Sequence, residues 1–190
     1  SAVYADGILL SNYLGNGATY APRWGMVSPE QIERVDVMYG PFSAAYPGNS
    51  VGAVVDYVTR MPKQFEAHAQ IGYTTQPFKL YNTDATYSAK QANASVGNKS
   101  GAWSWWLDVN RTDSVGQPQV FTTKLVSAGT GGTTGAPVTG AVLGLNRNND
   151  PWLILGTNTQ YSTVQNNVKA KLAYDFSPTV RASYTLGYWD

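Results

Sequence analysis

The chain has 190 residues, with 13 Lys and Arg against 12 Asp and Glu and no Cys. A formal net charge of +1 gives no reason to expect a nucleic-acid partner, and the lack of Cys excludes a disulfide framework and a thiolate metal site. Charged residues make up 13%, against about 25% in ordinary soluble domains, while Tyr, Trp and Gly are frequent. This composition is typical of a β protein with an apolar outer surface.

Neither end of the sequence reads as a natural terminus. No initiator Met or signal peptide stands at Ser1, and a strand pattern is still running at Asp190. We therefore expect an internal fragment. No apolar run reaches the roughly 20 residues that a membrane-spanning helix needs.

The first elements are short. Asp6-Gly7 separates two apolar runs and predicts a tight turn. Residues 12–26 form a loop rich in Gly, Asn and Tyr, in which Tyr20 and Trp24 either pack on the surface, the commoner case, or face a ligand. A short helix is predicted next, with Ser28 as N-cap, Pro29 at the first position and Gln31 completing a capping box.

Residues 32–62 hold two β-branched and aromatic runs around a segment rich in Gly, Pro and Ser. Val35–Tyr39 and Val54–Thr59 are predicted to be strands of one small sheet. Gly40 and Pro41 end the first strand, and Pro41 suits the start of a short helical turn that reaches Tyr46.

This segment resembles the end of the plug domain of TonB-dependent outer-membrane receptors. It departs from the family pattern at Tyr39, where the family usually has Arg, at Arg60, where Lys is usual, and at Pro47, Ala53 and Asp56, where Gly, Gly and Asn are usual. We call the following set of residues the plug motif: Ile32, Glu33, Arg34, Val35, Gly40, Pro41, Ser43, Tyr46, Gly52, Thr59 and Arg60.

After Pro62 the residues alternate with a period of two, which predicts strands. Five strands are predicted, at 67–75, 84–96, 103–110, 164–176 and 180–189, each near the roughly 9 to 11 residues of a tilted membrane strand or longer. Tight turns are predicted at 97–101 and 177–179, and residues 115–161 form a long Gly, Thr and Asn-rich connection that we expect to face the cell exterior.

The alternation also predicts which side chains face lipid. On the third predicted strand, alternate side chains point to opposite faces, so that one set of side chains faces lipid and the other set faces the lumen or the plug. The first set is Trp103, Trp105, Leu107 and Val109, and the second is Ser104, Trp106, Asp108 and Asn110. On the fourth strand, the polar residues Gln165, Asn167, Lys169 and Lys171 are candidate contacts to the plug.

The sequence shows no motif or spacing that is typical of a catalytic or metal-binding site. His68 is the only His, and a single His cannot assemble a zinc or iron site. No Cys nucleophile, G-x-S-x-G motif or phosphate-binding glycine loop is present. We expect neither an enzyme nor a bound cofactor.

The resemblance implies a mostly β fold, a fragment of a plugged transmembrane antiparallel β-barrel with a small α+β plug portion. Residues 1–62 would be the C-terminal part of the plug, and 63–190 the first five barrel strands. It implies a receptor in the outer membrane of a Gram-negative bacterium that imports a scarce solute with energy delivered through TonB. Its partners would be outer-membrane lipid, the TonB complex and a small-molecule ligand. The choice among siderophore, cobalamin, haem, nickel complex and oligosaccharide stays open.

Two other classes of protein share some of these sequence features. A passive porin or adhesin-like barrel would share the strands but not the plug motif. A secreted glycan hydrolase or lectin would need carboxylates beside aromatic platforms such as Trp103, Trp105 and Trp106, and no carboxylate pair lies with them.

Overall fold

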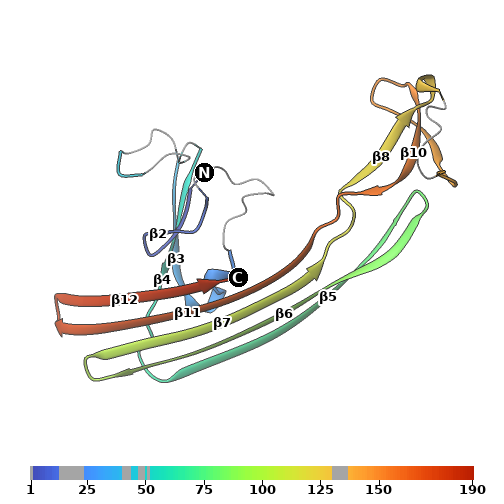
Figure 1. The fold of residues 1–190 in the computed structure, drawn as a ribbon. Helices are drawn as coiled ribbons and strands as arrows, with labels where there is room; N and C mark the ends of the chain where they lie inside the picture. Colours follow the sequence, from blue (N-terminus) through green and yellow to red (C-terminus); the bar gives the residue numbers. More distant parts are fainter. Residues whose placement is uncertain (1, 13–23, 40–43, 47–49, 51, 130–136) are drawn as a thin grey trace. The chain divides into compact units, whose positions relative to one another are not determined.

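A computed structural model describes residues 2–12, 24–39, 44–46, 50, 52–129 and 137–190 (Figure 1). The chain divides into two compact units, which are described separately. The first unit holds Ser1–Ile71, Gln91–Arg111 and Gln165–Asp190, and the second holds Gly72–Lys90 and Thr112–Val164.

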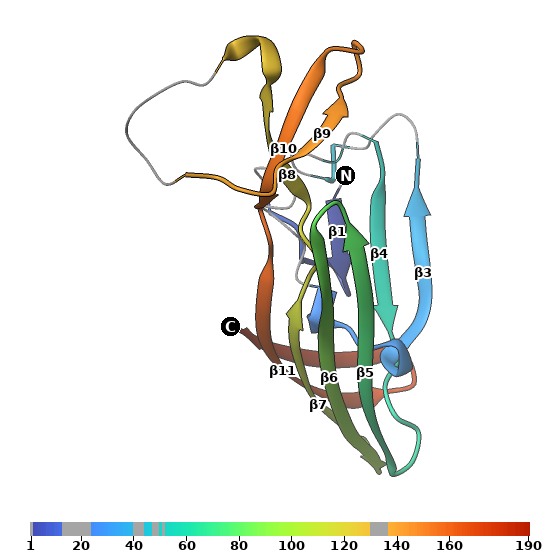
Figure 2. The same ribbon diagram turned by 90° about the vertical axis from the view of Figure 1, so that its right-hand side faces the viewer.

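The first unit contains a small four-stranded sheet in the order β2-β1-β4-β3, in which β4 lies between β1 and β3 (Figure 2). β4 runs parallel to β1 and antiparallel to β3. The predicted strands of the motif are therefore confirmed. The four strands are β1 Ala2–Ala5, β2 Ile8–Leu9, β3 Ile32–Met38 and β4 Val54–Thr59.

The predicted turn at Asp6-Gly7 is also confirmed. It joins β1 to β2, and both of its residues have positive φ, 49° and 77°. Two positive φ angles define the type I′ turn, whose twist matches that of a two-stranded hairpin.

Successive residues of β1 pack on opposite faces of the small sheet, as a strand requires. Ala2 and Tyr4 join Val54 on one face, where the Tyr4 and Tyr46 rings meet edge to face with centroids 5.7 Å apart. Val3, Ala5 and Leu10 form a cluster on the other face, and Met26 packs against it. Both faces of β1 are therefore covered, and all four of its residues are buried.

The expected helical part of the α+β portion is not found among the described residues, which hold only short 3-10 helices: η2 Trp24–Met26, η3 Pro29–Gln31 and η4 Val126–Ala128. The turn expected from Pro41 to Tyr46 lies mostly outside the described residues. No helix in the described ranges has the length and apolar composition to cross a membrane.

A capping box at the start of η3 is a wrong prediction. Ser28 has the extended backbone of an N-cap, but its side chain makes no cap hydrogen bond. The hydroxyl instead donates to Asp108, 80 residues away. A tertiary partner has replaced the local one.

Five long strands form one sheet in the order β12-β11-β7-β6-β5, which confirms the predicted set (Figure 1). Two-residue turns join β5 to β6, β6 to β7 and β11 to β12. The bounds are β5 Glu66–Leu80, β6 Thr83–Ser100, β7 Trp103–Val115, β11 Ser162–Ser177 and β12 Val180–Trp189.

The turn predicted at 97–101 is shorter than expected, because β6 continues to Ser100 and only Gly101 and Ala102 turn. Gly97 is a packing position. A Cβ there would lie 2.7 Å from Cε3 of Trp106 and 2.9 Å from the carbonyl oxygen of Trp105. Glycine allows the indole ring to lie against the backbone of β6.

The described part of the connection at 115–161 is more ordered than its composition suggests. It contains a second sheet, in the order β8-β10-β9, with a register shift between Ile154 and Gly156. In the same unit the ring of Tyr81 contacts Phe121 edge to face, at 4.9 Å between centroids. The strands are β8 Val120–Leu125, β9 Val142–Leu145 and β10 Pro151–Asn158.

Candidate functional site

The candidate site is the polar boundary, within the first unit, between the small sheet with its adjoining loops and one face of the five-stranded sheet. We call this face of the five-stranded sheet the inner face. On β7 the inner side chains Ser104, Trp106 and Asp108 are buried, while Trp103, Trp105 and the other odd-numbered residues up to Val109 are exposed. The predicted division of β7 into two faces is therefore confirmed.

Lys171 of β11 makes the most complete contact across this boundary. Its Nζ lies 2.8 Å from Oδ2 of Asp6 and donates to the Thr59 hydroxyl at 2.5 Å. The Thr59 hydroxyl donates in turn to Asp6 Oδ2, at 2.5 Å, and the Thr59 backbone N–H donates to Oδ1, at 2.8 Å. The turn of the first hairpin, the end of β4 and β11 thus meet at one carboxylate.

This environment controls the charge of Asp6. Burial alone would raise the pKa of the carboxyl group. The hydrogen bonds from Lys171 and Thr59, with the positive charge of Lys171, outweigh that effect and hold the Asp6 pKa below its ordinary value. Asp6 is therefore ionised at neutral pH, and the contact is a true ion pair.

Lys169, two residues earlier on the same face, reaches a loop residue. It is buried, and its Nζ donates to the carbonyl oxygen of Met26 at 2.7 Å. The Met26 side chain extends toward β12, where a Cβ on Gly187 would lie 2.1 Å from Met26 Cε. The absence of a side chain at Gly187 leaves room for Met26.

Asp108 of β7 makes a third contact across the boundary. Only 2% of this residue is exposed. Its Oδ2 accepts from the Ser28 hydroxyl at 3.0 Å and from Asn93 Nδ2 of β6 at 3.3 Å. A buried carboxylate with two donors is a specific anchor, because burying it without partners would be strongly unfavourable.

Arg60 makes the fourth contact, just after β4. Its guanidinium forms two parallel hydrogen bonds with the Glu66 carboxylate, at 2.9 and 2.8 Å, and lies 4.9 Å from the centre of the Trp106 ring. Its Nε donates to the carbonyl oxygen of Glu30. The planar fork of Arg fits a carboxylate in a way that Lys does not, so Arg60 makes a directed contact with Glu66.

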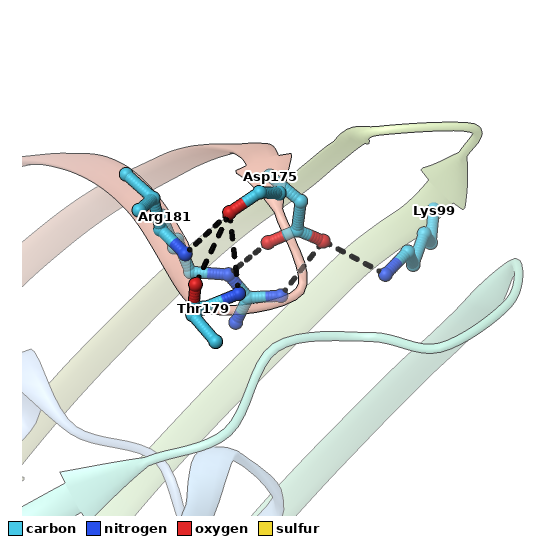
Figure 3. Close-up of polar contacts among 6 residues, drawn as sticks. Lys99, Asp175, Thr179 and Arg181 are labelled. Atoms are coloured by element: carbon cyan, nitrogen blue, oxygen red, sulfur yellow. Dashed lines mark hydrogen bonds and ion pairs between the residues drawn. The ribbon is translucent and has the colours of Figure 1, made fainter.

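A separate charged cluster lies at the turn between β11 and β12 (Figure 3). Asp175 accepts from Arg181 on the neighbouring strand and from Lys99 of β6, whose Nζ lies 3.0 Å from Oδ2. These residues belong to the five-stranded sheet alone. The cluster therefore connects the turns of the sheet and does not touch the small sheet.

The plug-motif residues do not all lie at the boundary. Thr59 and Arg60 lie at the boundary, whereas Glu33, Arg34 and Val35 are exposed on the edge strand β3. Of the others, Ile32 begins β3, Tyr46 packs on the core of the small sheet and Gly52 has a φ of 107°. The remaining members of the motif, Gly40, Pro41 and Ser43, lie outside the described residues.

Of the possible ligand-facing pair, only the backbone of Trp24 lies in the part that the structure describes. Trp24 belongs to η2, and Tyr20 lies outside the described residues. The ligand-facing role of the pair therefore stays a prediction.

The alternation along β11 predicts Lys169 and Lys171 as contacts to the plug but does not identify the residues that they touch. The local sequence around Asp6 indicates only a turn, and that around Ser28 only a helix cap. The alternation of polar and apolar residues along β7 and β11 is the sequence feature that helps, because it places the polar side chains of both strands on the inner face. The partners are separated by 80 to 165 residues in the chain, so no local pattern pairs them.

Among the described residues, the boundary is made of polar contacts between side chains or between a side chain and the backbone. Its charged groups contact each other, the backbone or, for Asp108, the Ser28 hydroxyl and the Asn93 amide, and in the described ranges no group of three or more His, Asp or Glu could hold a metal ion. It can hold two parts of the chain together through individual polar contacts, each of which can exchange with water. Such a boundary suits reversible separation better than an apolar core does.

Comparison with known proteins gives one match. Residues 1–54 match the family model of the TonB-dependent receptor plug domain. No curated protein and no solved structure matches the chain. The matched range contains Asp6, Met26 and Ser28, three of the residues that contact the five-stranded sheet.

Proposed function

We propose that this chain, a fragment of a TonB-dependent receptor by the plug domain in residues 1–54, carries the end of the plug and the first strands of the barrel wall around it. In this proposal residues 1–62 belong to the plug and 63–190 to the wall. The receptor resides in the outer membrane and imports a scarce solute, such as a siderophore or another metal complex, with energy delivered through TonB.

The observation that carries the proposal is the contact of Lys171 with Asp6 and Thr59. A plug that must move needs contacts to the wall that are specific but reversible, and a partly buried ion pair beside an exchangeable hydroxyl meets both needs. The outward faces of the strands support a membrane setting. Side chains such as Tyr184, Leu186 and Tyr188 are 59–66% exposed on β12, and such an apolar outer row is expected where a strand faces lipid.

The proposed transport can be tested with a removable tether. An ideal Cβ on Gly25 would lie 2.9 Å from Cγ of Asn167 on β11. The Cβ atom of residue 167 is one bond away from this Cγ, so the distance between the Cβ atoms of residues 25 and 167 is compatible with the roughly 3.5 to 4.5 Å that a disulfide requires. The double variant Gly25→Cys/Asn167→Cys in the full-length receptor should join plug and wall on oxidation.

Cells with the tethered receptor would be given a panel of radiolabelled ferric siderophores, haem, cobalamin, a nickel complex and an oligosaccharide. One of these should accumulate only when both the receptor and TonB are present. Oxidation should abolish that accumulation and a reductant should restore it, with each single Cys variant as control. Accumulation that continues without TonB or despite the tether would favour the passive barrel.

A further inference from the structure

The outward face of the five-stranded sheet, opposite the inner face, carries a shallow groove within the first unit. Its volume is about 420 Å³, and it crosses β5, β6, β7 and β11. Ala92 and Ala94 of β6 form part of its floor, between the larger Ile71 of β5 and Val109 of β7. The two alanines lie on the same face of β6 and give the groove an apolar surface that a hydrocarbon chain can cover.

Arg111 borders this groove. It is exposed like Val109, two residues earlier on the same face of β7. Its Nη1 donates to Oδ1 of Asn166 on β11 at 2.8 Å, and it forms no ion pair with any carboxylate of the described ranges. Since a guanidinium has five N–H donors, most of its hydrogen-bonding capacity remains available beside Asn166.

The position of Arg111 along β7 matches a membrane interface. Eight residues separate it from Trp103, which is about 27 Å along a strand at roughly 3.4 Å per residue. With a tilt of 35–45° that length spans a height of about 20 Å, close to the roughly 25 Å apolar band of outer-membrane strands.

Aromatic residues occupy the other end of this span. The Trp103 ring lies 4.7 Å from that of Tyr174, and Phe176 lies 4.8 Å further on, both measured between centroids. Rings of this kind favour the boundary between hydrocarbon and water. Arg111 thus lies near the opposite boundary, at the level of lipid head groups.

We propose that Arg111, oriented by Asn166, binds the phosphate of a membrane lipid whose acyl chain lies in the adjoining groove. This inference rests on the proposed function, since it requires the outward face to be in a membrane. The planar guanidinium is suited to two parallel hydrogen bonds with phosphate oxygens, and the groove supplies the apolar surface that a free phosphate ion would not use. The lipid belongs to the leaflet farther from the turn at Gly101 and Ala102.

The test uses the purified full-length receptor, titrated in detergent with dimyristoylphosphatidic acid and observed by native mass spectrometry. Arg111→Gln should weaken binding about tenfold, equivalent to the loss of about 1.4 kcal/mol, and Arg111→Lys should retain part of the affinity. Arg147→Gln, the same charge change in the loop between β9 and β10, is the matched control and should bind normally. Ala94→Trp fills the groove and should also weaken binding.

Two further ligands separate the sources of affinity. Dimyristoylglycerol, which lacks the phosphate, should bind weakly and equally to the parent and to Arg111→Gln. Inorganic phosphate should not displace the lipid at equal concentration. Displacement by inorganic phosphate, or equal lipid affinity for Arg111→Gln and Arg147→Gln, would overturn the proposal.

The parent receptor's membrane location is measured separately, by outer-membrane fractionation and heat-modifiable mobility. A parent that fractionates with the outer membrane while Arg111→Gln keeps full lipid affinity would refute the lipid site alone. A parent that does not enter the outer membrane would refute both the membrane assignment and the lipid site.

Discussion

Replacing Lys171 by Met should loosen the plug while leaving the five-stranded sheet folded. Met keeps most of the volume and removes the charge that faces Asp6. Breaking a buried ion pair from one side costs about 3 to 5 kcal/mol. The Asp6 side chain is 26% exposed and keeps both hydrogen bonds from Thr59, so water and Thr59 reduce the expected cost to about 2 kcal/mol.

The Thr59 amide reports this loss directly, because its N–H donates to Asp6. Hydrogen exchange of the full-length receptor measures the free energy of local opening at that amide. A loss of about 2 kcal/mol corresponds to roughly 30-fold faster exchange. Lys79→Met is the control, since Lys79 and Asp84 form an exposed pair with side chains 79% and 70% exposed, and such pairs contribute about 0 to 1 kcal/mol.

A double-mutant cycle separates the pair from its surroundings. Asp6→Asn leaves the nearly buried Lys171 without its countercharge and should accelerate exchange further than Lys171→Met does. The double variant should be less harmful than the sum of the two, with a coupling of about 1 to 2 kcal/mol. Unchanged Thr59 exchange in Lys171→Met, or additive effects, would refute the ion pair as a contact that holds the plug.

Three further predictions concern the same boundary and the outward face. Gly97→Ala should destabilise the receptor by about 1 to 3 kcal/mol, measured by denaturant unfolding, because the added Cβ meets Trp106 and a backbone oxygen. Gly156→Ala, where nothing lies within 4 Å, should be close to neutral, and equal effects would contradict the packing argument. Leu107→Arg should cost about 2 to 4 kcal/mol near the bilayer midplane and reduce the heat-modifiable folded form. Leu107→Ile should leave the amount of the folded form unchanged. Normal assembly of the Leu107→Arg variant would show that this face of β7 does not contact lipid. Folding lowers the pKa of Asp6. Ionised Asp6 therefore stabilises the folded state fully when the pH is above the pKa of the unfolded chain, about 3.9, and this stabilisation is lost as the pH falls through the lower pKa of the folded state. Exchange at Thr59, corrected for the intrinsic pH dependence of exchange, should accelerate in that acid range in the parent and not in Asp6→Asn; an equal response of both would exclude Asp6 as the titrating group.

The strands were predictable because their signals are local. The alternation from Trp103 to Val109 assigns each side chain of β7 to one face, and Asp6-Gly7 has the residue types that a type I′ turn requires. β8–β10 escaped prediction because Thr and Gly weaken the contrast between the two faces of a strand.

The site itself was less predictable. The phase of β11 placed Lys169 and Lys171 on the covered face, but their partners depend on how a distant turn and loop pack. The local sequence is also misleading at Gly97. A glycine in this context favours a turn, but Gly97 instead leaves space for the ring of Trp106 on β7. Ser28 illustrates the competition directly, since its hydroxyl suits a cap but bonds to Asp108.

The parallel pairing of β1 and β4 has a mechanical consequence. A pull on the chain before Ala2, resisted beyond Thr59, acts along the two strands in opposite directions. Residues 2–5 pair with 54–57, so this load shears the intervening hydrogen bonds together, whereas the side-chain contacts at Lys171 and Asp108 can yield one at a time. Under tension the pairing of β1 with β4 should therefore break less easily than the side-chain contacts that hold the small sheet to the five-stranded sheet. Force from the N-terminal side should therefore detach the small sheet as a unit before it extends the sheet's strands.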